Sequence, residues 1–145
     1  MLVQQILKSK AKSGVLFVKS DAKVSDAAKV LAENRIGSVV VSDDDGATAI
    51  GILSERDIVR ELSRVGAPCM EQPVSAYMTS KLVTCTSQAS AEEILTQMTE
   101  GRFRHMPVVE DGKLTGLVTL GDVVKAQLSE LAMEKQALEG MIMGH

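Results

Sequence analysis

The chain has 145 residues, 45% hydrophobic and 24% charged, with a formal net charge of −3. This is a globular composition, which excludes a disordered or collagen-like chain. With three aromatic residues and an acidic charge balance, nucleic-acid binding is disfavoured. No apolar run reaches the ~18 residues of a membrane span, and the first residues lack the order of a signal peptide. We therefore expect a cytoplasmic protein with no nucleic-acid or membrane partner, and with Cys69 and Cys85 reduced.

The first half of the chain predicts the order strand, helix, strand, strand, helix, after an apolar helical stripe from Leu2 to Leu7. Short apolar runs give the strands, and apolar residues three and four apart give the helices. The acidic run Asp43–Asp45 with Gly46 is expected to be a solvated turn rather than a cation site. The expected elements are strands at 15–18, 38–41 and 49–53, and helices over 24–31 and 57–65.

The second half predicts the same order of elements. Ser90-x-x-Glu93 is a capping box that opens a helix, and residues 110–113 form a tight hairpin between two strands. A shift of 67 residues superposes 23–41 on 90–108, and a shift of 65 superposes 51–57 on 116–122. The chain is therefore a duplicated β-α-β-β-α unit. The expected strands of the second copy are 82–85, 106–109 and 114–118.

These patterns predict an α/β (α+β) fold of two units that pack on each other through their sheets, because a unit of ~50 residues is too small to be stable alone. The apolar stripes at the two ends, Leu2–Leu7 and Val124–Ile142, exceed the needs of such a core and predict a homodimer. The expected segments are an N-terminal helical segment 1–13, a first unit 14–66, a linker 67–73, a second unit 74–127 and a C-terminal helix 128–145.

One polar signature, G-x-x-[ST]-x-x-D, recurs where a strand ends and a helix begins, with Ser54 and Asp57 in the first copy and Thr119 and Asp122 in the second. One interpretation is structural, because Ser or Thr caps the helix and Asp completes a capping box. The other is functional, because a helix N-terminus attracts phosphate and an ionised Asp accepts hydrogen bonds from a ribose diol. Both can hold at once.

A second cluster, Arg102–Pro107, offers an Arg fork and a titratable His to a phosphate, or else is an exposed basic loop. The matching residues of the first copy, 35–40, are much less basic, which predicts two unequal sites. Walker, G-x-G-x-x-G and H-E-x-x-H motifs are absent, and His105 has no nucleophile beside it in sequence. We therefore expect neither an enzyme nor a metal site.

The repeated segments GILSERDIV and GLVTLGDVV, the segment RFRHMPVVEDGKL and the 65–67 residue period resemble a CBS (cystathionine β-synthase) domain pair, also called a Bateman module. The resemblance covers residues 14 to 127. It implies two units related by pseudo-twofold symmetry, disc-shaped dimers, and clefts that bind adenosyl ligands such as AMP, ADP, ATP, NAD(H) or S-adenosylmethionine. Val40 departs from the pattern, since Pro107 stands at its position in the second copy.

In the family each cleft takes residues from both copies. One cleft would therefore use Ile52, Ser54, Arg56, Asp57, Met78, Val83, Arg104 and His105. The other would use Leu117, Thr119, Asp122, Leu16, Ile36, Gly37 and Ser38, without a basic pair. The Asp would hold ribose, Ser or Thr and the basic pair would hold phosphate, and aliphatic side chains would enclose adenine.

The sequence therefore predicts a stand-alone regulatory module that senses an adenosyl ligand and passes the signal to a regulated protein or through its own dimer. The alternative is a dimerisation scaffold without a physiological nucleotide, in which the two Asp residues only cap helices.

Overall fold

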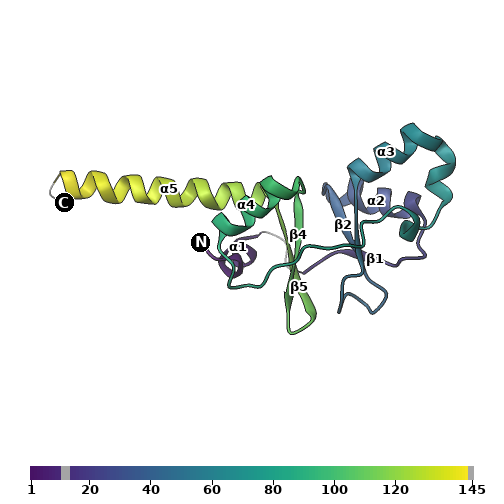
Figure 1. Ribbon diagram of the computed structural model, residues 1–145, viewed down its shortest axis with the longest axis horizontal. Coiled ribbons are helices and arrows are strands. Elements are labelled where there is room, and N and C mark those ends of the chain that lie inside the picture. The colour runs from purple at the N-terminus through teal and green to yellow at the C-terminus, as the bar shows by residue number, and fades with distance from the viewer. Residues whose placement is uncertain (11–13, 144–145) are drawn as a thin grey trace.

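The computed structural model describes residues 1–10 and 14–143. It is the mixed α and β fold that the sequence predicts, with two similar units and a long C-terminal helix (Figure 1). The elements in chain order are α1 (Val3–Ser9), β1 (Phe17–Val18), α2 (Val24–Asn34), β2 (Ser38–Val41), β3 (Gly51–Ser54), α3 (Glu55–Val65), the 3-10 helices η1 (Ala67–Glu71) and η2 (Val74–Ala76), α4 (Ala91–Gly101), β4 (His105–Glu110), β5 (Lys113–Thr119) and α5 (Leu120–Ile142).

The first unit contains a three-stranded sheet in the order β1-β2-β3, in which β1 is parallel and β3 antiparallel to β2. Because side chains alternate along a strand, β2 has two different faces. Val39 and Val41 pack into the core with α2 and α3, whereas Val40 lies on the other face, opposite Ile52 of β3. Ile52, on this second face of the sheet, lines the space between the two units.

The second unit contains the antiparallel hairpin β4-β5, paired from His105 with Thr119 to Glu110 with Lys113. The expected strand at 82–85 does not form as a strand, and only Cys85 makes an isolated bridge, to Val108. The apolar run there predicts a strand, but Leu82 and Val83 line a cleft instead.

Each unit takes part of its core from outside its expected boundaries. Val3 and Ile6 of α1 are 0% and 2% exposed and belong to the core of the second unit. Val74, just after the expected linker, belongs to the core of the first unit. The expectation that the N-terminal apolar stripe exceeds the needs of the core is therefore wrong for Val3 and Ile6, while the homodimer stays a prediction.

The duplication extends to the backbone conformation. The helices α2 and α4 both end at an arginine in the left-handed region, Arg35 with φ 52° and Arg102 with φ 56°. The turns after β2 and β4 both contain an Asp-Gly pair with positive φ, Asp45-Gly46 and Asp111-Gly112. Since non-glycine residues rarely adopt positive φ, matching occurrences at matching positions indicate one conformation built twice.

Figure 1 shows the two sheets side by side in the middle of the molecule, with α2 and α3 outside one and α1 and α4 outside the other. The helix α5 begins beside α4 and continues far beyond it into open space. It runs without interruption from Leu120 to Ile142, so the structure has no break between the expected second unit and the C-terminal helix.

Candidate functional site

A cleft of about 1300 Å³ lies between the two units. It brings together seven of the eight residues predicted for the first site, namely Ile52, Ser54, Arg56, Asp57, Val83, Arg104 and His105. Met78 is not part of the lining; it packs against Gly51 and the core of the first unit. The volume exceeds the 300–1,000 Å³ typical of small-molecule pockets, so a nucleotide-sized ligand can enter.

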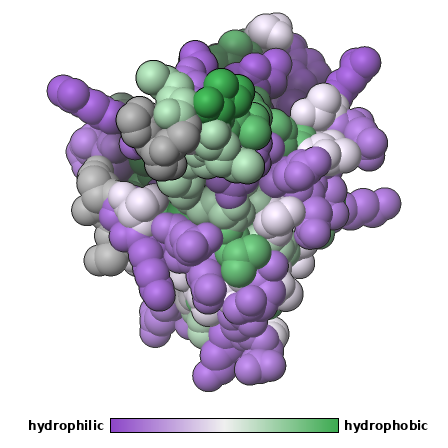
Figure 2. Space-filling view, turned by 90° about the vertical axis from the view of Figure 1, so that its left-hand side faces the viewer, coloured by the Kyte–Doolittle hydropathy of each residue, from purple (hydrophilic) through white to green (hydrophobic). Residues whose placement is uncertain are grey.

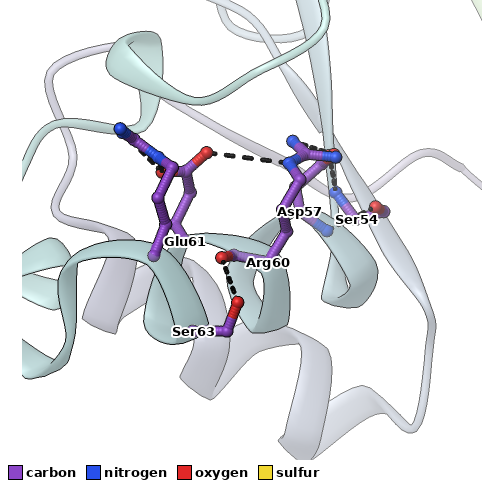
Figure 3. Close-up of polar contacts among 6 residues, drawn as sticks. Ser54, Asp57, Arg60, Glu61 and Ser63 are labelled. Carbon is purple, nitrogen blue, oxygen red and sulfur yellow. Dashed lines mark hydrogen bonds and ion pairs between the residues drawn. The ribbon is translucent and has the colours of Figure 1, made fainter.

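Ser54 and Asp57 form a complete capping box at the start of α3. The Asp57 backbone N–H donates to Ser54 Oγ at 3.1 Å, and the Ser54 N–H donates to Asp57 Oδ2 at 2.9 Å. Arg60 Nη2 donates to Asp57 Oδ1 at 3.0 Å, and its guanidinium also lies beside Glu61 (Figure 3). The helix-cap interpretation of the signature is therefore correct, and the cap holds the carboxylate at the edge of the cleft.

The Arg60 side chain is 60% exposed and the Asp57 side chain 12%, so solvent screens this ion pair on the Arg60 side and a ligand can reach the guanidinium. A ligand hydroxyl can replace the guanidinium at Oδ1 while the bond from Ser54 N–H to Oδ2 stays in place. Capping and ligand binding therefore do not compete for the same carboxylate oxygen.

The loops that precede β2 and β4 meet at this cleft. A Cβ placed on Gly37 would lie 3.6 Å from Glu55 Oε1 and 3.7 Å from His105 Nε2, which shows how closely the two units approach here. Burial lowers the pKa of His105 below its ordinary value, although Glu55 acts in the opposite direction. Burial therefore favours the neutral imidazole in the free protein.

The cleft gathers positive charge in a chain whose net charge is negative. Three cationic residues that were not among the predicted site residues also line it, namely Arg60, Lys81 and Arg102. With Arg56 and Arg104 they make five basic side chains, against the two carboxylates Glu55 and Asp57. Arg60 could have been found from the sequence, because it lies one helical turn after Asp57, and Arg102 belongs to the basic cluster.

Five of the seven residues predicted for the second site lie outside this cleft. Gly37 and Thr119 line the cleft already described, and Ile36 lines a hollow of about 470 Å³ between α2 and α3. Leu16 is exposed, whereas Ser38 is buried in β2, and its Oγ has no hydrogen-bond partner among the described residues. The remaining two, Leu117 and Asp122, both contact one lysine.

That lysine is Lys10, which follows α1. Its Nζ donates to Asp122 Oδ2 at 2.9 Å and to the Leu117 carbonyl at 2.9 Å. Burial alone would raise the pKa of Asp122, but hydrogen bonds from Lys10 and from Thr119 N–H outweigh it and hold the pKa below its ordinary value. Asp122 also completes a capping box with Thr119, as Asp57 does with Ser54.

Lys10 thus bonds two of the residues expected to contact a ligand in the second site. The two carboxylates of the repeat have cationic partners of different kinds. Arg60 comes from the next turn of the same helix as Asp57, whereas Lys10 is 112 residues from Asp122 in sequence. Each of the two carboxylates therefore has a cationic partner within the chain, at 3.0 Å for Asp57 and 2.9 Å for Asp122.

Residues 1–10 and 14–143 contain no cluster of three or more His, Cys, Asp or Glu side chains placed to hold a metal ion. No helix among them is both long enough and apolar enough to cross a membrane.

Comparison with known proteins identifies the family. The family model described as "CBS domain" matches residues 4–64 and 74–129. The chain belongs to the CBS domain family. The CBS domain-containing protein CBSX3, mitochondrial, from Arabidopsis thaliana is 34% identical over 148 residues, which cover 98% of this chain and 72% of that protein.

Solved structures of CBS proteins have the same fold. The CBS-domain containing protein ATU1752 from Agrobacterium tumefaciens is 40% identical, with a TM-score of 0.82 over 88% of this chain and 99% of that chain. The CBS domain pair of protein MJ0100 is 22% identical, with a TM-score of 0.77 over 90% of this chain and 98% of that chain, and was solved with 5-methylthioadenosine and S-adenosyl-L-methionine.

Proposed function

We propose that this CBS domain pair is a regulatory module that binds an adenosyl ligand, AMP, ADP, ATP or NAD(H), in the cleft bordered by Asp57. The observation that carries the proposal is the composition of the cleft. Three kinds of side chain line the cleft: the Asp57 carboxylate at the start of α3, several basic side chains, and aliphatic side chains from both units. Each of these features matches one part of a nucleotide.

The ribose would bind at Asp57, whose ionised carboxylate accepts hydrogen bonds from two neighbouring hydroxyls. The phosphates would lie toward Arg104 and His105, and toward Ser54 at the start of α3, where the helix dipole favours an anion. Ile52 and Val83 would enclose the adenine from the two units. A ligand held in this way contacts both units at once and favours whichever arrangement of them it binds more tightly.

The complex of the MJ0100 domain pair with two adenosyl compounds supports the ligand class, since the fold is shared. It also supports testing S-adenosylmethionine, which the family resemblance already implies as a ligand. The signal would pass to a regulated protein or through a homodimer of this chain. The cytoplasmic location expected from the sequence stays a prediction, and the name of the Arabidopsis relative assigns that protein to mitochondria.

The second candidate function is a dimerisation scaffold without a physiological nucleotide. It is favoured by one observation: both oxygens of Asp57 already have partners in the chain, Ser54 N–H and Arg60. In that case the carboxylate serves helix α3 alone.

Calorimetric titration separates the two candidates. AMP, ADP, ATP, NADH and S-adenosylmethionine are titrated into the protein, with GMP as the control for recognition of adenine. The regulatory proposal expects at least one adenosyl ligand to bind at micromolar concentration and GMP to bind more weakly. Absence of binding by all five favours the scaffold, and conversion of a nucleotide during the titration would make the protein an enzyme.

A further inference from the structure

The exposed apolar residues of α5 form one continuous stripe. At about 100° per residue, Leu128, Leu131, Leu138 and Ile142 all lie within about 40° of Val124 around the helix. These five side chains are 38% to 83% exposed. Figure 2 looks at the molecule from the free end of α5 and shows hydrophobic residues gathered there among hydrophilic ones.

The stripe is not the face by which α5 packs on its own domain. Val123 and Ala126 are the buried residues of the helix, and they lie about 100° to 160° around the helix from Val124. A second helix can therefore cover the stripe along its length without displacing α5 from the domain. Figure 1 shows that most of α5 has no neighbour in the chain.

The stripe has the spacing of a coiled-coil seam, with positions a at 128, 135 and 142 and positions d at 124, 131 and 138. Lys135 is the one charged residue at these positions. In a parallel pair Lys135 would face Lys135 of the second copy, and Glu134 would face Glu139 of the second copy. Both contacts bring like charges together, so the parallel arrangement is disfavoured.

An antiparallel pair centred on Met133 avoids most of these contacts. Val124 then packs against Ile142 of the second copy and Leu128 against Leu138, while the stem of Lys135 packs against Leu131. Lys125 faces Glu139 of the second copy at both ends of the pair, and the one like-charge contact left is between the two Glu134 side chains. Lys125 and Glu139 are both exposed in the single chain. Glu139 also lies 3.9 Å from Lys135 of its own helix, an exposed ion pair of the kind that contributes at most ~1 kcal/mol.

We propose that α5 pairs with α5 of a second copy of this chain as an antiparallel two-stranded coiled coil centred on Met133. This pairing does not depend on the proposed nucleotide binding. It leaves the Asp57 cleft open, because none of the five stripe residues lines it.

The oligomeric state is tested by light scattering on the full chain. The wild type is expected at twice the 15.5 kDa mass of the chain at tens of micromolar. The double variant Leu131→Lys/Leu138→Lys is expected to be monomeric with unchanged helical circular dichroism, because the replaced side chains are exposed. The control Gln136→Lys changes the same helix outside the stripe and is expected to stay dimeric. A monomeric wild type, or a dimer that survives the double variant, would overturn the proposal.

The orientation is tested by cross-linking single-cysteine variants. Oxidation of a mixture of Leu128→Cys and Leu138→Cys is expected to give a disulfide-linked heterodimer, whereas neither variant alone is expected to cross-link. Self-linking of each variant alone would show a parallel pair and contradict the proposal. The native cysteines can stay, because Cys69 is buried and burial raises the pKa of Cys85 to about 11. The wild type measures their background.

Discussion

Lys10 contacts Asp122 in the second copy of the repeat, and we predict that removing this contact frees Asp122 for a ligand. In the free protein Lys10 Nζ holds both the carboxylate and the Leu117 carbonyl, so a ligand that needs Asp122 must displace the lysine first. We predict that Lys10→Met, which keeps an aliphatic side chain of similar length, raises the affinity of the second site for adenosine. Adenosine is the right probe because it is neutral, so loss of the lysine charge does not itself change the attraction.

The size of the effect follows from the exposure of the pair. An exposed ion pair contributes up to ~1 kcal/mol, and a hydrogen bond to a charged group contributes ~1.5–3 kcal/mol. The Lys10 and Asp122 side chains are 30% and 23% exposed, so solvent screens the pair in part. We therefore take the free energy of the Lys10–Asp122 contact as ~1–2 kcal/mol. That free energy corresponds to a gain in affinity of about 5- to 30-fold.

Calorimetry with adenosine measures this gain. The wild type is expected to show binding at the Asp57 cleft and only weak binding elsewhere, and Lys10→Met is expected to show a second event of increased affinity. Lys8→Met is the matched control, because Lys8 is exposed near the end of the same helix. Equal binding by all three proteins would refute the idea that Lys10 occupies the second site.

Three other predictions concern the cleft and the packing of α1. Arg104→Ala should lower the ratio of ATP affinity to adenosine affinity about tenfold, since a charged donor to phosphate is roughly twice as strong as a neutral one. The control is Lys113→Ala, which changes an exposed lysine outside the cleft and should leave the ratio unchanged in the same titrations. ATP affinity should rise as the pH falls below 6.5, because burial lowers the pKa of His105 and a bound phosphate favours the protonated imidazole. Titrations of ATP from pH 5 to 8 measure this rise. A His105→Gln variant whose ATP affinity rose in the same way would contradict the prediction. Gly116→Ala should lower the free energy of unfolding by ~1 kcal/mol, because the added Cβ would lie 2.8 Å from the Leu7 side chain of α1. Urea denaturation measures this change. An unchanged free energy of unfolding would show that Leu7 moves aside freely.

Features that depend on neighbouring residues could be predicted from the sequence. The strand Ser38–Val41 and the capping boxes at Ser54 and Thr119 are set by local side chains, so the residues alone indicate them. The gathering of Asp57 with Arg104 and His105 came from the family resemblance instead, because sequence spacing alone does not bring together residues of two units.

Features that depend on long-range packing could not be predicted. The helix α1 carries an apolar stripe that suits any apolar surface, and the sequence does not show that this surface is the core of the second unit. The same holds for Lys10, whose partner Asp122 lies near the other end of the chain. The run 82–85 is apolar and β-branched as a strand would be, but Leu82 and Val83 face the cleft instead.

The central claim, that Asp57 holds the ribose of an adenosyl ligand, is tested most directly by titrating AMP into the wild type and Asp57→Asn. Asparagine keeps an oxygen for the Ser54 N–H and so preserves the helix cap, but it removes the charge that a ribose diol would use. Loss of charge-assisted hydrogen bonds of ~1–3 kcal/mol predicts affinity weakened by about 5- to 150-fold in a variant that remains folded. Unchanged affinity in folded Asp57→Asn would contradict the account and leave Asp57 as a helix cap alone.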